Sequence, residues 1–162
     1  MATAGNNYST IHKEELPDGG SFSFALVVAE WNGDITSKLT EGAKNTLLTA
    51  GVAEKNISTY MVPGTFELPY AAAQICKNNK VDGVITIGCV IRGETAHFDY
   101  VCQGTTYGIQ KLNTEQDIPV IFCVLTDDNK QQSIDRSGGE HGNKGDECAA
   151  AVLKMAAFRK GL

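Results

Sequence analysis

The segment RGETAHFDYVCQG, from Arg92 to Gly104, places a basic side chain, acidic side chains, a hydroxyl group and one of the three histidines within a few residues. The imidazole of His97 can give and take protons near neutral pH, because the unperturbed pKa of histidine is about 6.5. Gly93, Glu94 and Thr95, just before it, can offer backbone N–H and hydroxyl donors to a phosphate group. A solvated loop explains an arbitrary histidine more often than catalysis does, so this segment alone leaves both explanations open.

Two further segments carry side chains suited to a polar ligand. In PGTFELP, Thr65 and Glu67 stand at the expected start of a helix, where unpaired backbone N–H groups favour anionic or hydroxyl-rich ligands. The ordinary alternative is a helix start that Thr65 caps and whose dipole Glu67 complements. In AEWN, the indole of Trp31 can stack on a heterocycle, although a single tryptophan more often packs partly buried on its own helix.

The segment DRSGGEHGNKG brings two basic residues to a glycine-rich turn. Arg136 can clamp a phosphate with two N–H donors, and Lys144 can add a point charge. The alternative is that Arg136 lies near the negative end of its helix dipole and is followed by a flexible connection. A metal site is not expected, because His97, Asp99 and Cys102 match no strong ligand spacing.

Apolar runs of strand length alternate with segments of helical periodicity along most of the chain. Nearly continuous apolar runs predict buried strands, and apolar residues at three- and four-residue intervals predict helices. Asp99 is the expected N-cap of the third helix. The alternation predicts one α/β domain with a parallel sheet and helices on both faces. The expected strands lie within residues 21–31, 56–62, 81–91 and 118–126, and the expected helices within 35–47, 68–76, 99–113, 129–137 and 148–156.

Ligands of open α/β sheets collect at the carboxyl ends of the strands. In this chain those ends are AEWNGD, VPGTFELP, GCVIRGETAHFDY and VLTDDN. The polar and aromatic residues singled out above are concentrated in these segments. We therefore expect them to meet at one edge of the sheet.

The chain has 162 residues, of which 42% are hydrophobic and 20% charged, as expected for one soluble globular domain. The formal net charge of -5 argues against a nucleic-acid surface, which needs a concentrated excess of Lys and Arg. The chain starts without a signal-peptide pattern, and its apolar runs are too short for a membrane span. Five cysteines without a CxxC pair suit a reducing cytosol, so a cytoplasmic location is expected.

Taken together, AEWN, VPGTFELP, GCVIRGETAHFDYV, IPVIFCVLT and GNKGDECA resemble the lumazine synthase family in order and spacing, from about Phe22 to Phe158. The resemblance implies a three-layer, flavodoxin-like fold with a four-stranded parallel sheet over residues 21–162. It also implies an N-terminal arm, residues 1–20, that adds a strand to a neighbouring subunit.

The same resemblance implies the penultimate reaction of riboflavin biosynthesis. In that reaction 5-amino-6-(D-ribitylamino)uracil condenses with 3,4-dihydroxy-2-butanone 4-phosphate to give 6,7-dimethyl-8-ribityllumazine, phosphate and water. The amine attacks the ketone to form an imine, phosphate is eliminated, and the ring closes. No metal or organic cofactor is implied.

Roles for individual residues follow from the resemblance by position. His97 matches the proton-transfer residue, and Phe122 and Arg136 match residues that the neighbouring subunit supplies in the family. The positions that match the ribitylaminouracil site are Trp31, Thr65, Phe66, Glu67, Cys89, Val90, Ile91 and Phe122. The positions that match the phosphate site are Glu94, Thr95, Arg136 and Lys144.

The resemblance further implies a homopentamer with sites shared between subunits. Capsid-forming members of that family keep the turn between Arg136 and Lys144 short and glycine-containing, as it is here, so the resemblance favours a 60-subunit icosahedral shell over a free pentamer. Riboflavin synthase is a protein partner that the resemblance allows. Nucleic acid and membrane partners are not expected.

Three other functions remain open at this point. An archaeal-type riboflavin synthase shares the fold but dismutates two lumazines and needs no butanone phosphate. A non-enzymatic flavin- or nucleotide-binding module needs a Ser/Thr/Gly-rich phosphate loop after the first strand, which EWNGDITSKL does not resemble. The presence of His97, Arg136 and Lys144 argues against a shell protein without catalysis.

Overall fold

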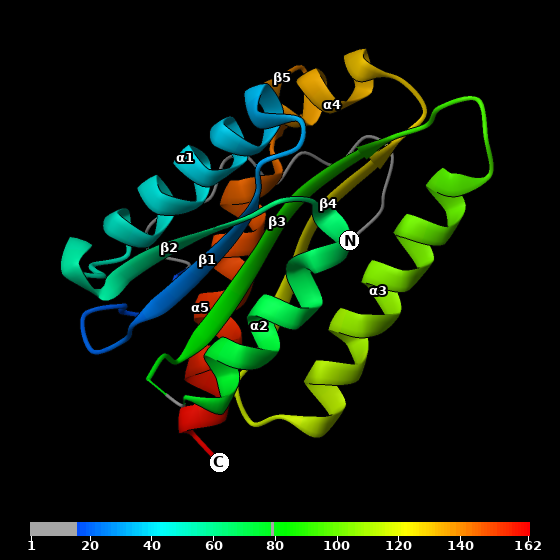
Figure 1. Cartoon of the computed structure of the whole chain (residues 1–162). Helices are drawn as coiled ribbons and strands as arrows, with labels where there is room; N and C mark the ends of the chain where they lie inside the picture. Colours follow the sequence, from blue (N-terminus) through cyan, green and yellow to red (C-terminus); the bar gives the residue numbers. More distant parts are fainter. Residues whose placement is uncertain (1–15, 79) are drawn as a thin grey trace.

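Four parallel strands form the central sheet of the protein. A computed structural model describes residues 16–78 and 80–162 (Figure 1). The strands are β1 (Phe24–Ala29), β2 (Ile57–Val62), β3 (Gly83–Ile91) and β4 (Val120–Asp127), in the spatial order β2-β1-β3-β4. The parallel four-stranded sheet confirms the expected fold class. Most of the N-terminal arm expected over residues 1–20 lies outside the described residues.

Helices cover both faces of this sheet and complete the three layers (Figure 1). On one face lie α1 (Gly33–Thr49), α4 (Lys130–Arg136) and α5 (Lys144–Lys160), and on the other lie α2 (Leu68–Lys77) and α3 (His97–Glu115). Two short 3-10 turns, η2 (Glu54–Asn56) and η3 (Thr65–Glu67), precede β2 and α2. A small antiparallel hairpin of β5 (Ser137–Gly139) and β6 (Gly142–Asn143) joins α4 to α5.

Each face of the sheet has its own apolar core. Leu26 and Ile85 pack with Leu39 and Leu153 under α1 and α5, and all four side chains are fully buried. Val27 and Val84 belong to the core on the α2 and α3 side. The central strands are therefore buried on both faces, which explains why their sequences are almost continuously apolar.

Helix α3 differs from the expectation at its start. It begins at His97 after Ala96, and Asp99 lies in its first turn instead of capping it. The carboxylate of Asp99 is paired with Arg92, whose Nη1 lies 3.2 Å from Oδ1. His97 is consequently the first residue of a helix, with a position fixed by that helix.

The glycine-rich turn forms the β5–β6 hairpin, which periodicity did not predict. Gly138 and Gly142 have φ values of 115° and 71°, in the left-handed region that glycine adopts without steric cost. The hairpin sets the spacing between Arg136, at the end of α4, and Lys144, at the start of α5. Two residues with expected roles thus stand at either end of a defined turn.

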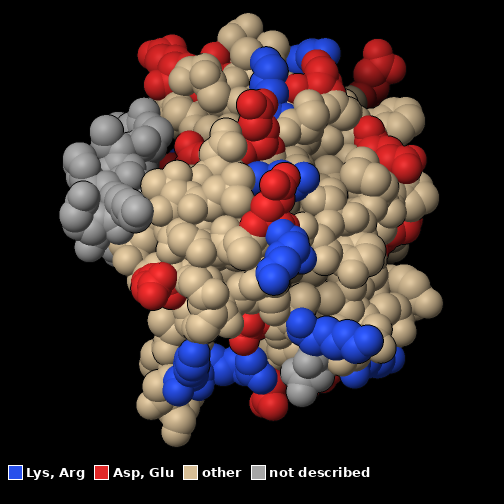
Figure 2. All heavy atoms as spheres, turned by 90° about the vertical axis from the view of Figure 1, so that its left-hand side faces the viewer, with Lys and Arg blue, Asp and Glu red and all other residues tan. Residues whose placement is uncertain are grey.

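Charges of both signs are interspersed on the face of the molecule shown in Figure 2. That face has no continuous basic field of the kind that a nucleic-acid surface requires. Among the described helices, none combines the length and the hydropathy needed to cross a membrane.

Candidate active site

A pocket of about 410 Å³ opens at the carboxyl edge of the sheet, and we call it the carboxyl-edge pocket. Four segments build it: the end of β1, the η3 turn, the end of β3 and the start of α3. The sequence predicted that these segments would meet. The lining residues are Trp31, Asn32, Gly64, Thr65, Phe66, Glu67, Cys89, Val90, Ile91, Gly93, Thr95, His97, Phe98 and Val101. Nine of them are predicted site residues, namely Trp31, Thr65, Phe66, Glu67, Cys89, Val90, Ile91, Thr95 and His97.

Trp31 presents its indole at the mouth of the pocket. The residue is 73% exposed, so the alternative of a partly buried tryptophan packed on its own helix is wrong. An exposed ring beside a pocket can stack on a flat heterocycle with little rearrangement. Trp31 is also the single tryptophan of the chain, so its fluorescence reports on this pocket.

Asn32 supports the pocket and was missed by sequence reasoning. Its φ of 59° is left-handed, and its side-chain Nδ2 donates a hydrogen bond of 2.9 Å to the carbonyl oxygen of Cys89. This bond ties the end of β1 to the end of β3 directly beside Trp31. Asparagine tolerates the left-handed region better than most residues, and an Asn-Gly pair after a strand was the available signal.

Two glycines allow the η3 turn to approach the sheet and α3. A Cβ atom on Gly88 would lie 2.8 Å from Oγ1 of Thr65, and one on Gly104 would lie 2.5 Å from the ring of Phe66. Thr65 is buried, whereas Phe66 is 59% exposed. No side-chain cap is formed at this turn, so Thr65 does not act as the helix cap that its position suggested. Its hydroxyl instead packs on the bare backbone of β3.

Strand β3 extends beyond its neighbour β1. The pairing of the two strands runs from Phe24 with Gly83 to Val28 with Ile87, whereas β3 continues to Ile91. On the side of β3 that faces β1, the backbone after Ile87 has no strand partner in the described part of the chain. Asn32 binds it at Cys89. Backbone N–H and C=O groups that face a pocket in this way are available to a ligand with its own donors and acceptors.

The histidine and the neighbouring arginine have different surroundings. His97 is exposed at the start of α3, and its backbone N–H donates to Oγ1 of Thr95 at 3.4 Å. Arg92 lies over the ring of Phe98 at 4.1 Å and pairs with Asp99, and with Asp128 at 2.9 Å. These three contacts occupy the guanidinium of Arg92 beside the carboxyl-edge pocket. His97 is among the residues that line the pocket.

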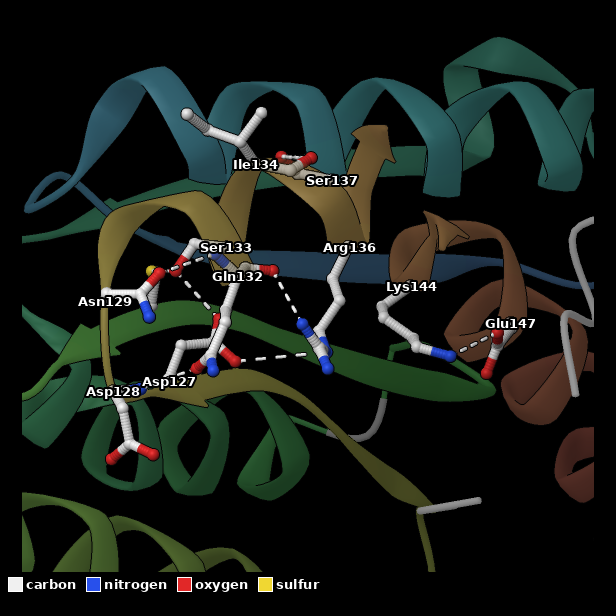
Figure 3. A network of polar contacts seen from close by, with 11 residues as sticks. Asp127, Asp128, Asn129, Gln132, Ser133, Ile134, Arg136, Ser137, Lys144 and Glu147 are labelled. Carbon is white, nitrogen blue, oxygen red and sulfur yellow. Dashed lines mark hydrogen bonds and ion pairs between the residues drawn. The ribbon is translucent and has the colours of Figure 1, made fainter. Parts of the chain in front are cut away.

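The remaining predicted residues do not line the carboxyl-edge pocket. Glu94 is exposed in the loop before α3, and Phe122 lines a second hollow. Lys144 and Arg136 lie on the α5 and α4 side, where Nζ of Lys144 is 2.6 Å from Oε1 of the buried Glu147 (Figure 3). Within residues 16–78 and 80–162, no lysine or arginine lines the carboxyl-edge pocket.

The second hollow, of about 790 Å³, lies along the free edge of β4, and we call it the β4-edge groove. Residues of α3, β4 and the end of α5 line it, including Ile109, Phe122, Met155, Phe158 and Leu162. The last four of these apolar side chains are 36% to 94% exposed. Gathered apolar side chains on a surface are characteristic of an interaction site.

Fold and pocket together define a flavodoxin-like α/β protein with a ligand pocket at the carboxyl edge of its sheet. The family model for 6,7-dimethyl-8-ribityllumazine synthase matches residues 21–160. Proteins with that name include relatives from Flavobacterium johnsoniae, 54% identical, and Phocaeicola vulgatus, 52% identical. The alignment with the first relative covers 99% of this chain and 84% of the relative. The alignment with the second covers 100% of this chain and 96% of the relative. A relative from Porphyromonas gingivalis is 51% identical, with 99% of each chain covered. The chain therefore belongs to the 6,7-dimethyl-8-ribityllumazine synthase family.

The role of Asn32 leads to a test with two substitutions. Asn32→Gly keeps the left-handed backbone but removes the amide donor, whereas Asn32→Ala also adds backbone strain of about 1–2 kcal/mol. We expect Asn32→Ala to lower the free energy of unfolding by that amount more than Asn32→Gly does, as measured by urea denaturation. Equal stability of the two variants would contradict a strained position at the mouth of the pocket.

Proposed function

We propose that this protein catalyses the condensation of 5-amino-6-(D-ribitylamino)uracil with 3,4-dihydroxy-2-butanone 4-phosphate to 6,7-dimethyl-8-ribityllumazine. The products besides the lumazine are phosphate and water. Membership of the family and the names of its relatives support this reaction. The single structural observation that carries the proposal is the carboxyl-edge pocket, because it gathers nine residues whose assigned roles come from separate motifs.

The pocket offers each part of the pyrimidine substrate a suitable surface. The exposed indole of Trp31 can stack on the flat ring, and those backbone groups of residues 89–91 that face away from β4 and are not bound by Asn32 can pair with the polar edge of the uracil. At the η3 turn, the hydroxyl of Thr65 can donate or accept hydrogen bonds, and the carboxylate of Glu67 can accept them from the ribityl hydroxyls. Such fixed contacts hold the amine in one orientation toward the ketone.

Positioning accounts for much of the catalysis of a condensation. Holding two reactants in a productive geometry removes the entropic cost of bringing them together, worth up to about 7–11 kcal/mol of the barrier. The amine attacks the ketone carbon, and one water is lost as the imine forms. Removal of a proton then allows the C–O bond to phosphate to break, and the second nitrogen closes the ring with loss of another water. His97 lies at the pocket where these protons must move.

The phosphate group needs a source of positive charge. Glu67 lines the pocket, and no lysine or arginine does among the described residues. We assign the contacts to phosphate to Glu94 and Thr95 from the loop before α3, and to Arg136 with Lys144 from a second copy of the chain. Phe122 of that second copy would complete the aromatic wall. A composite site of this kind would explain why Arg136 and Lys144 are not among the residues that line the pocket of their own chain.

A homopentamer with shared sites fits the surface of the molecule. The β4-edge groove presents apolar side chains to a second copy, and Phe122 is one of them. The N-terminal arm would add a strand to the sheet of a neighbour. Given the short hairpin between Arg136 and Lys144, we assign the assembly to a 60-subunit shell, within which riboflavin synthase is a candidate partner. A cytoplasmic location agrees with the use of cysteine without disulfides.

A product assay separates this function from the archaeal-type riboflavin synthase and from a binding module. The purified protein should form fluorescent lumazine from the two substrates and none when butanone phosphate is omitted. Formation of riboflavin from lumazine alone would instead identify a dismutase. Ligand binding without turnover would identify a binding module.

The role of His97 predicts a large loss of rate on substitution. His97→Ala should lower kcat by about 100-fold or more, because general acid–base catalysis typically contributes that factor. His141→Ala is the matched control, since His141 is also exposed but does not line the pocket. Initial rates of lumazine formation measure both. An unchanged rate for assembled His97→Ala protein would exclude the proton-transfer role.

Shared sites predict that two inactive variants restore activity when mixed. His97→Ala and Arg136→Ala damage different halves of a composite site, so a mixed ring contains some intact sites. Random reassembly of equal amounts should restore about one quarter of the wild-type rate if each site uses two adjacent chains. Mass spectrometry of the native rings verifies mixing. Mixed rings that stay inactive would contradict subunit sharing.

A further inference from the structure

Asp127 is a buried carboxylate at the end of β4 that none of the assigned roles uses. Its side chain is 8% exposed, and alternation along the strand directs it to the same face as Cys123 and Leu125. A buried carboxylate is costly unless charge or hydrogen bonds compensate it. The surroundings of Asp127 therefore need a physical explanation.

One oxygen of Asp127 is held by a chain of buried donors. Ser133 is fully buried, and its hydroxyl donates a hydrogen bond of 2.7 Å to Oδ2 of Asp127. The single proton of that hydroxyl is used in the bond to Asp127. Its oxygen therefore accepts a hydrogen bond from the thiol of Cys89, with Sγ 3.4 Å from Oγ. Burial raises the pKa of the Cys89 thiol, which keeps the sulfur protonated and able to donate. These contacts prevent the carboxylate from rotating.

The other oxygen of Asp127 faces Arg136. Nε of Arg136 lies 4.0 Å from Oδ1, a distance of electrostatic attraction and not of a direct hydrogen bond. The guanidinium is also fixed by Nη1, which donates to the carbonyl oxygen of Gln132 at 2.9 Å. Figure 3 shows this arrangement, with Arg136 directed toward Asp127 and Lys144 toward Glu147. Within the described residues, Arg136 is the cation that compensates the buried carboxylate.

The arrangement leaves one edge of the guanidinium available. In Arg136, Nε faces the carboxylate of Asp127 and one N–H of Nη1 is bound to Gln132. The N–H groups of Nη2 form no hydrogen bond to any described residue. The side chain of Arg136 is one-third exposed, at 33%. A guanidinium clamps phosphate with two parallel N–H donors, which requires a fixed plane.

We infer that Asp127, held by Ser133, is a positioning residue that fixes the plane of Arg136 so that its free edge receives the substrate phosphate. The inference rests on the proposed function for the identity of the anion. It assigns an effect on phosphate affinity to a residue that contacts no substrate. Asp127 acts through Arg136 and takes no part in proton transfer.

A purely electrostatic effect of Asp127 on phosphate binding would have the opposite sign to a positioning effect. The sign of the change in phosphate affinity therefore distinguishes the two roles. Removing a negative charge beside Arg136 strengthens the attraction for an anion, whereas losing the orientation of the guanidinium weakens binding. Asp135→Asn removes an equal charge on α4, the helix that carries Arg136, but the bond of the Asp135 carboxylate is to Gln131 and not to Arg136. It is the matched control for Asp127→Asn. Ser133→Ala is a second variant, which keeps the charge of Asp127 and removes only the hydroxyl that holds it.

The test is titration of the assembled full-length protein with inorganic phosphate by calorimetry, together with steady-state kinetics. For Asp127→Asn we expect a phosphate dissociation constant and a KM for butanone phosphate about 3- to 10-fold higher, with kcat and the KM for the pyrimidine within about twofold. Ser133→Ala should change the same two constants in the same direction. Asp135→Asn should leave phosphate binding equal or tighter.

Each outcome decides a separate claim. If Asp127→Asn binds phosphate as tightly as Asp135→Asn, or more tightly, the positioning role is overturned while lumazine formation by the wild type still supports the proposed function. If the wild type forms no lumazine, the proposed function fails, and the phosphate titration still decides the role of Asp127. Wild-type protein that does not bind phosphate would overturn the inference as well.

Discussion

The candidate site depends on one feature of the sheet, the extension of β3 beyond the end of β1. Pairing between the two strands ends at Val28 and Ile87, and β3 continues to Ile91. Its free backbone forms the floor of the carboxyl-edge pocket, and the bare backbone at Gly88 lets Thr65 pack against it. The bond from Asn32 to the carbonyl oxygen of Cys89 then closes the side of the pocket nearest β1. A sheet with strands of equal length would offer no such surface.

The basic side chains suited to phosphate lie outside the lining of this pocket. The described part of its lining includes Glu67 and His97, but no lysine or arginine. The arginine and lysine suited to phosphate are held on the α4 and α5 side by Asp127 and Glu147. In the composite site that we propose, an anionic substrate requires the surfaces of two chains, which would link catalysis to assembly. The exposed apolar side chains of the β4-edge groove are the surface to which we assign contacts in the proposed assembly.

The sequence predicted the four parallel strands, the helices and the segments that meet at the pocket, because apolar runs and helical periodicity reflect burial directly. The start of α3 at His97 was missed, since Asp99 pairs with Arg92 instead of capping the helix. The left-handed backbone at Asn32 and the buried chain from Cys89 through Ser133 to Asp127 were also missed. The buried chain joins side chains of β3, α4 and β4, and no local pattern encodes such contacts, whereas the Asn-Gly pair after β1 was a local signal for the backbone at Asn32. The roles assigned to individual site residues remain predictions.

The central claim is that the anion is bound between a pocket of one chain and the arginine of another. The most direct measurement is a structure of the assembled protein with inorganic phosphate bound, determined by crystallography or electron microscopy. The account predicts phosphate between the loop that carries Glu94 and Thr95 in one subunit and the free guanidinium edge of Arg136 from its neighbour. Phosphate bound within a single chain, or Arg136 far from the anion in the assembly, would contradict it.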